Sequence, residues 1–226
     1  MASEGTVGPG EVQPVPYQAR PGQEAPAERR ERGLRGLSIA ARLLAGASTF
    51  FFMSFLFAYF YLRSLNNAHM WKPAHVKPDQ GLGAAFIACI VLSAAAAILA
   101  GRRQKNWSGW TTPTIVAIVL GLAAVALQCI EYTVQKWGPT AGAYASVFLA
   151  WTAFYLIAVL GTMYWLEIQV ATELRERRKP TARPGEGVTE YEDPDKLLPR
   201  GMDAAVFYWA FLAGLGVIAY VVLYLV

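Results

Sequence analysis

Residues 121–165 read GLAAVALQCIEYTVQKWGPTAGAYASVFLAWTAFYLIAVLGTMYW, and this stretch decides the fold class of the chain. It contains two apolar runs on either side of a short polar turn, residues 135–142. A helix rises about 1.5 Å per residue, so each run is long enough to cross a hydrocarbon layer of about 30 Å. No catalytic or cofactor-binding motif occurs in the stretch. It therefore predicts two membrane-spanning helices joined by a tight turn.

Two polar residues, Gln128 and Glu131, lie near the end of the first run. They are three positions apart, so they share a face of a helix, with Tyr132 beside them. A carboxylate at this depth is costly unless it faces protein or water. Two interpretations follow. Glu131 braces a hydrogen-bond network between helices, or its side chain reaches out to water at the membrane surface.

The composition indicates a helical membrane protein. Of 226 residues, 55% are hydrophobic and 16% are charged, and the charges lie in blocks between apolar runs. These values exclude an ordinary soluble domain, and the short alternating strands of an outer-membrane barrel are absent. The net charge of +4 comes from basic residues beside the spans, so we expect no nucleic-acid partner. Cys89 and Cys129 lie inside apolar runs, where cysteine usually serves packing.

The chain divides into a polar tail and a membrane domain. Residues 1–36 are rich in Pro, Gly, Glu and Arg, so we expect a tail that is disordered unless a partner binds it. Residues 37–226 are predicted to form an all-α integral membrane domain, a bundle of five transmembrane helices. The expected spans are 38–62, 81–100, 112–134, 143–174 and 202–226, and a polar loop covers about 175–201.

Lys and Arg gather on one side of this arrangement, in the tail, in the linker after the second span and in the loop after the fourth. The other side has only Arg63, Lys72, Lys77 and Lys136. Because basic residues favour the cytoplasmic side, we predict that the amino terminus lies inside and the carboxyl terminus outside. This orientation places Glu131 toward the outer face of the membrane.

Several motifs resemble subunit III of the haem-copper cytochrome c oxidases in order and spacing. That family ends one helix with Gln-x-x-Glu-Tyr and begins the next with Tyr-x-Ser-x-Phe, followed by Thr-Gly-Phe. Its last helix opens with Tyr-Trp, and its aromatic helix ends in Tyr-Phe-Tyr-Leu-Arg. Here the corresponding residues are 128–132, 144–148, 152–154, 208–209 and 59–63, with Ala153 in place of the glycine. The resemblance covers about residues 48–225, and short bacterial members of the family have five helices.

The resemblance implies a role inside a larger complex. The chain would be a non-catalytic structural subunit of an aa3-type cytochrome c oxidase in the bacterial cell (inner) membrane. It would pack on oxidase subunits I and II, which would carry haem a and copper, and it would hold phospholipid. The complex would pass electrons from cytochrome c to oxygen while protons are pumped. The tail and the long loop are candidates for contacts in a respiratory supercomplex.

The chain departs from the family at polar positions inside the bundle. The family usually has a Glu near the start of the aromatic helix, two histidines after Thr-Gly-Phe, and a His and an Asp after Tyr-Trp. Here those positions hold Thr49, Tyr155, Ala158, Ala210 and Ala213. A packing role survives these changes, whereas proton delivery through the same groups does not carry over. A subunit III-like component of a quinol oxidase or nitric oxide reductase, an unrelated scaffold and a transporter are the alternatives.

Aromatic and basic residues near the spans are candidate lipid contacts. The resemblance implies that the aromatic helix, with Phe51, Phe55 and Tyr59, grips acyl chains. Arg175 and Arg178 follow the fourth span and would hold anionic head groups.

His69 and His75 are the two histidines of the chain, and both lie in the loop after the first span. A haem or binuclear metal site needs more donors, at helical spacing inside the membrane. We therefore expect no catalytic, cofactor-binding or metal-binding residue in this chain. Solvent or another subunit is the expected neighbour of both histidines.

Overall fold

The computed structural model describes residues 26–65, 71–105, 109–177 and 198–226. A 3₁₀ turn, η1 (Pro139–Ala141), precedes the fourth helix, and a π-helical turn, η3 (Val221–Leu225), extends the fifth. The five long helices are α1 (Pro26–Ser64), α2 (Gln80–Lys105), α3 (Thr111–Val134), α4 (Ala143–Arg177) and α5 (Leu198–Tyr220).

Each of these five helices contains a segment long and apolar enough to cross a membrane. The predicted all-α fold of five transmembrane helices is confirmed, and every predicted span falls on one helix, the last including η3. The segments are Gly36–Ser64, Gln80–Gln104, Thr111–Val134, Ala143–Thr172 and Met202–Leu225.

The first helix begins earlier than the predicted first span. α1 starts at Pro26, inside the segment 1–36 that the sequence predicts to be a polar tail. The added residues are rich in Glu and Arg, which favour helix, and proline at the first helical position lacks only an N–H that the helix does not use. Of the tail predicted to be disordered, residues 1–36, the part from Pro26 is helical, and residues 1–25 lie outside the described residues.

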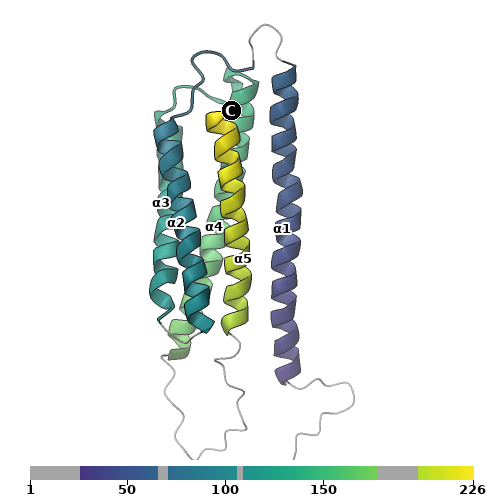
Figure 1. The fold of residues 1–226 in the computed structure, drawn as a ribbon, viewed down its shortest axis with the longest axis vertical. Helices are drawn as coiled ribbons and strands as arrows, with labels where there is room; N and C mark the ends of the chain where they lie inside the picture. Colours follow the sequence, from purple (N-terminus) through teal and green to yellow (C-terminus); the bar gives the residue numbers. More distant parts are fainter. Residues whose placement is uncertain (1–25, 66–70, 106–108, 178–197) are drawn as a thin grey trace, which may run out of the picture.

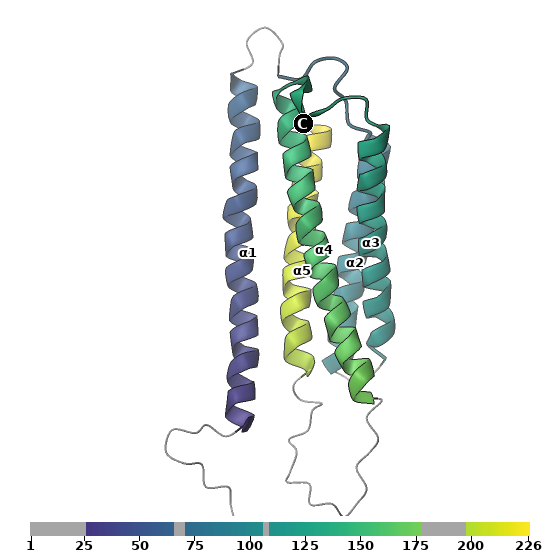
Figure 2. The same cartoon turned by 180° about the vertical axis from the view of Figure 1, so that it is seen from behind.

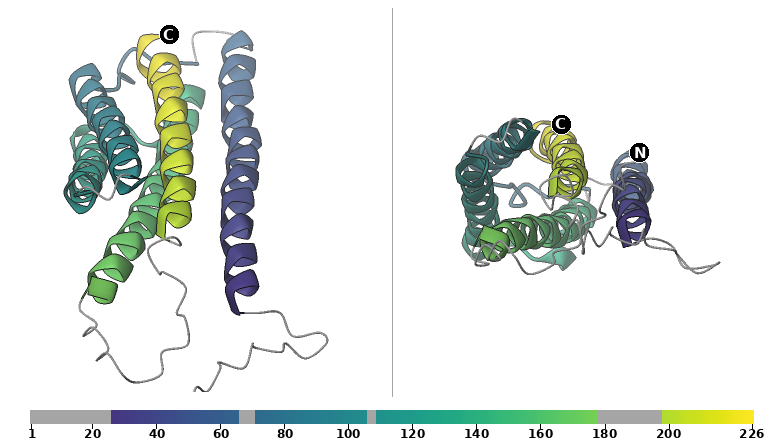
Figure 3. Two further views of the ribbon diagram at one scale, coloured as in Figure 1. Left: turned by 60° about the horizontal axis from the view of Figure 1, so that its bottom comes forward. Right: turned by 90° about the horizontal axis from the view of Figure 1, so that it is seen from below.

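Successive helices run in opposite directions along one long axis (Figures 1 and 2). α2 packs along both α3 and α5, and α4 contacts α3 and α5. α1 stands at one side of the bundle, against α5 and α4 (Figure 3). Large apolar side chains of α1 are consequently exposed, and Phe50 is 84% accessible. This surface faces lipid or another protein, because apolar side chains of this kind are unfavourable in water.

Direct hydrogen bonds join three helices in the middle of the bundle. Trp209 Nε1 of α5 donates to Ser93 Oγ of α2 at 3.1 Å, and Ser93 Oγ donates to the Ala117 carbonyl of α3 at 2.5 Å. All three residues are buried. A polar group inside a membrane bundle needs such a partner because hydrocarbon offers none. The two bonds fix α2, α3 and α5 relative to one another.

One end of the bundle is closed by the segment 71–79, the turn 135–142 and η3, and we call it the pocket end. Tyr144 ties these parts together. Its N–H donates to the Trp71 carbonyl at 3.0 Å, and its hydroxyl donates to the Leu223 carbonyl at 2.5 Å. The start of α4 is thereby joined to the loop before α2 and to the turn after α5.

The turn between α3 and α4 is held at the same end. Trp137 Nε1 donates to the Lys77 carbonyl at 3.3 Å, so this turn is tied to the segment before α2. Gly142 has a φ of 152°, which residues with a side chain rarely adopt. Glycine at this position lets the chain turn sharply into α4.

Candidate functional site

Gln128 and Glu131 lie on the inner face of α3 near the pocket end, and each is only 1% exposed. Gln128 Nε2 donates to Glu131 Oε2 at 2.8 Å. The three-residue spacing brings the two side chains to one face, as the sequence predicts. The Glu131 side chain is enclosed by protein, so it is not extended to the membrane surface.

Tyr224 of η3 is a second partner of Glu131, and the sequence analysis missed it. Its hydroxyl donates to Glu131 Oε2 at 2.6 Å, although the two residues are 93 positions apart in the chain. The Tyr224 ring lies so close to Gly83 of α2 that a Cβ at Gly83 would overlap it. A tyrosine near the carboxyl-terminal end of the last span, level with Glu131, is the signal that could have identified this partner.

Both hydrogen bonds to Glu131 end on the same carboxyl oxygen. Within the described part of the chain, Glu131 Oε1 and Gln128 Oε1 are buried and have no hydrogen-bond partner. A buried polar atom without a partner costs about 1–3 kcal/mol relative to a bonded one. The site therefore has hydrogen-bonding capacity left on both sides of the Gln128–Glu131 pair.

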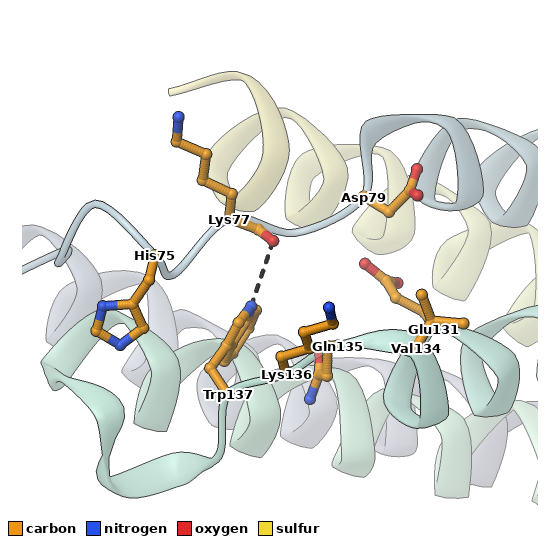
Figure 4. A pocket seen from close by; sticks show the side chains of 8 residues that line it. All are labelled: His75, Lys77, Asp79, Glu131, Val134, Gln135, Lys136 and Trp137. Carbon is orange, nitrogen blue, oxygen red and sulfur yellow. Dashed lines mark hydrogen bonds between the residues drawn. The ribbon is translucent and has the colours of Figure 1, made fainter.

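A pocket of about 290 Å³ lies beside Glu131 at the pocket end. Figure 4 shows the carboxyl groups of Asp79 and Glu131 on facing sides of it, while the ammonium of Lys77 points away. Its volume is just below the range of about 300–1,000 Å³ usual for small-molecule sites, so it suits water or a small polar group. The lining residues are His75, Lys77, Asp79, Glu131, Val134, Gln135, Lys136 and Trp137.

Asp79, at the edge of this pocket, has a structural role as the N-terminal cap of α2. Its Oδ1 accepts hydrogen bonds from the N–H groups of Gly81, at 2.8 Å, and Leu82, at 3.0 Å. These are among the N–H groups that the first turn of a helix leaves unpaired, and the helix dipole favours a carboxylate there. An acidic residue beside the pocket is thus accounted for as the cap of α2.

Tyr132 makes a separate contact on the neighbouring face of α3. Its hydroxyl donates to Thr152 Oγ1 of α4 at 2.6 Å, and Thr152 Oγ1 donates to the Phe148 carbonyl at 2.7 Å. The predicted trio therefore divides in two. Gln128 and Glu131 connect α3 to η3, and Tyr132 connects α3 to α4.

Lys72 lies in the loop before α2, outside the membrane spans, with Nζ 4.2 Å from the ring centroid of Tyr144. This is the geometry of a cation–π interaction. Partial removal from water lowers the pKa of the Lys72 ammonium below its usual range, and the charges of Arg63 and Lys77 lower that pKa further. The lowered pKa makes the neutral amine of Lys72 more abundant than that of an ordinary lysine.

The candidate lipid contacts do not all lie on one surface. Phe51 is 43% exposed and Phe55 is half-buried, and both rings contact Phe154 of α4. Tyr59 is corrected to an interior position, because it is 2% exposed and packs edge-on against Trp71 at 5.1 Å between ring centroids. Arg175 is exposed near the end of α4, and Arg178 lies outside the described residues.

Tyr155, one of the positions where the chain departs from the subunit III pattern, and Ser48, which precedes another, make hydrogen bonds to α5. Tyr155, at the place of a histidine, donates from its hydroxyl to the Leu212 carbonyl of α5 at 2.8 Å. Ser48, before Thr49, lies 3.0 Å from the Tyr208 hydroxyl of α5 between oxygen atoms. These contacts join α4 and α1 to α5, so polar groups here serve helix packing.

His75 lines the pocket, whereas His69 lies outside the described residues. Among the residues that the structure describes, no three His, Cys, Asp or Glu side chains gather closely enough to hold a metal ion. The expectation that neither histidine binds a metal stays a prediction.

A comparison with protein families gives a match over a large part of the chain. The model of the family described as cytochrome c oxidase subunit III matches residues 28–178. The matched region runs from the first turn of α1 to the end of α4, so it includes Gln128, Glu131 and Tyr132 and ends before α5. It covers more than half of the chain.

Proposed function

Because this chain belongs to the cytochrome c oxidase subunit III family, we propose that it is a non-catalytic structural subunit of an aa3-type oxidase. Family membership makes it a component of a haem-copper oxidase and a multi-pass membrane protein. The proposal adds its place in that complex. It packs on the catalytic subunit I and on subunit II, in the cell (inner) membrane of a bacterium with an aerobic respiratory chain.

The observation that supports this proposal is that the buried polar groups form hydrogen bonds between helices. Glu131 accepts hydrogen bonds from Gln128 and from Tyr224 of η3, and Tyr132 bonds to α4. Such bonds hold helices in fixed positions, which is what a subunit that braces a neighbour requires. The exposed apolar face of α1, with Phe50 and Phe57, supplies surface for lipid or for another subunit.

Haem a and copper are assigned to the partner subunits. Haem ligation in a membrane bundle needs histidine or a comparable donor directed between helices. Both histidines of this chain lie in the loop between α1 and α2, outside the spans. The residues present therefore do not fit a haem or copper site.

Bound phospholipid is the second part of the proposal. Phe51 and Phe55 form an aromatic surface with Phe154 that suits acyl chains. Arg175 is exposed near the other end of α4, where a basic side chain suits an anionic head group, and Arg178 follows it in sequence. Tyr59 is left out because it is buried.

The test is gentle detergent extraction of the membrane with an affinity tag on this chain. The chain should copurify with a haem-bearing complex that has an a-type absorption band and oxidises cytochrome c. Recovery of the chain without any haem would contradict the proposal. A complex that oxidises quinol instead of cytochrome c would move the chain to a quinol oxidase.

Glu131→Ala tests the bracing role within the purified complex. Loss of the Tyr224 and Gln128 bonds should release the chain more readily in detergent, while the haem spectrum stays unchanged. Glu167→Ala, which removes an exposed carboxylate from α4, is the matched control and should leave retention unaltered. A changed haem spectrum in the Glu131 variant would mean that the residue acts on the metal centre.

A further inference from the structure

A second, much smaller cavity lies inside the bundle, behind Gln128. Its volume is about 10 Å³, close to the least space that holds one water molecule. Residues from four helices and from η3 surround it: Phe86, Gln128, Trp151, Thr152, Tyr155, Gly216, Ala219, Tyr220, Leu223 and Tyr224.

Two unpaired polar atoms belong to residues that line this cavity. Among the described residues, Gln128 Oε1 and Trp151 Nε1 are buried without a hydrogen-bond partner, and both residues are 1% exposed. The two atoms are complementary, because an amide oxygen only accepts hydrogen bonds and an indole N–H only donates one. They come from different helices, α3 and α4.

We propose that Gln128 and Trp151 bind one buried water molecule in this cavity. The water accepts a hydrogen bond from Trp151 Nε1 and donates one to Gln128 Oε1. Thr152 also lines the cavity, and its hydroxyl oxygen, which already accepts a bond from Tyr132, has a second lone pair for the other water proton. Three hydrogen bonds are the usual number for a buried water.

The hydrogen bond to Glu131 determines how the Gln128 amide is oriented. Nε2 must face Glu131 Oε2, where it donates at 2.8 Å, so Oε1 faces the cavity. A flipped amide would leave the carboxyl without its Gln128 donor. The bound water then pairs the amide oxygen that Glu131 leaves free and extends the hydrogen-bonded chain from η3 through α3 to α4.

The first test is a map of the intact purified complex at a resolution where other buried waters are visible. We expect a single peak about 2.7–3.2 Å from both Gln128 Oε1 and Trp151 Nε1. An empty cavity at that resolution, or a direct Gln128–Trp151 hydrogen bond, would overturn the proposal. This measurement uses the natural sequence, so it does not depend on how any variant folds.

Variants test whether these two side chains hold the water. Trp151→Phe keeps an aromatic ring but removes the N–H donor. Gln128→Met keeps a side chain of similar length but removes the amide oxygen that accepts. The peak should disappear in both. Trp209→Phe is the matched control, because the Trp209 indole bonds directly to Ser93, and the peak should persist in it. A peak that survives Trp151→Phe and Gln128→Met unchanged would show that other groups bind the water.

Discussion

Glu131 of α3 accepts one hydrogen bond from another element. The donor is the hydroxyl of Tyr224 in η3, 2.6 Å from Glu131 Oε2. A hydrogen bond to a buried carboxyl group is strong because the interior of a bundle has a low dielectric constant. Gln128 contributes the second bond from within α3. A single hydroxyl group, that of Tyr224, therefore makes the hydrogen bond between η3 and Glu131.

Tyr224→Phe removes that hydroxyl and keeps the ring. We expect the chain to lose about 0.5–2 kcal/mol of stability, the usual range for a hydrogen bond between membrane helices, because Glu131 keeps only the Gln128 bond. Thermal release of the chain from the purified complex measures the effect. Tyr164→Phe, at an exposed position on α4, should change it little. Equal behaviour of the two variants would contradict the assigned role of Tyr224.

Lys72 allows a prediction about pH. Its lowered pKa means that the neutral amine, the form that reacts with acylating reagents, appears at a lower pH than for an ordinary lysine with a pKa of about 10.4. Labelling of Lys72, followed by mass spectrometry over a pH series, should therefore rise earlier than labelling of an unfolded reference peptide.

Arg63→Gln checks the electrostatic part of this shift. Removing the nearby positive charge should raise the pKa of Lys72, so its labelling should move to higher pH. Arg103→Gln, at the far end of α2, is the control and should have no effect. Coincident curves for Lys72 and the reference peptide would refute the prediction.

At the scale of whole elements, the sequence was sufficient to locate all five helices. Apolar length decides where a membrane helix lies, so α3 and α4 begin within one residue of the predicted spans. The predicted first span, 38–62, lies inside the apolar segment Gly36–Ser64, whereas the helix α1 continues beyond it into charged residues that also favour helix.

Close approach of elements was harder to predict. The contact of η3 with α2 depends on Gly83, which has no side chain to hold the Tyr224 ring away. Nothing in the local sequence of α2 distinguishes this glycine from Gly81, two positions earlier. Only the position of α5 relative to α2 makes one of them a contact point.

Gly83→Ala places a methyl group where the Tyr224 ring lies. The ring must move, so the Tyr224–Glu131 hydrogen bond should lengthen or break, at a cost of about 1–3 kcal/mol. Gly161→Ala, where a Cβ would meet nothing within 4 Å, is the control. Thermal release of the two variants from the complex is the comparison, and combining Gly83→Ala with Tyr224→Phe should cost less than the sum of both.

At the scale of the molecule, the sequence placed Gln128 and Glu131 together but could not provide their distant partners. Local spacing predicts contacts within α3, whereas Tyr224 and Trp151 come from other helices whose rotation is set by packing. Tyr59 was misplaced for the same reason. Its aromatic neighbours in sequence suggested one lipid-facing surface, but the helix turns Tyr59 toward Trp71.

The orientation of the molecule in the membrane is open to a direct experiment. In a background with Cys89 and Cys129 replaced by alanine, single cysteines are introduced at Thr140 and at Arg103, which are exposed at opposite ends of the bundle. We expect a membrane-impermeant maleimide to label the Thr140 variant in intact cells and the Arg103 variant only after lysis. The reverse pattern would place the amino terminus outside.

The separation of 93 positions between Glu131 and Tyr224 also has a consequence for biosynthesis. At about 5–20 residues per second, a ribosome needs about 5–20 s to add the intervening polypeptide. Throughout that interval the nascent third span is already made while its tyrosine donor has not been translated. Until the last span is inserted, water at the bilayer surface or an insertion factor must solvate the Glu131 carboxyl group in place of Tyr224. The pocket end, with its Tyr224–Glu131 hydrogen bond, is therefore completed among the final steps of synthesis.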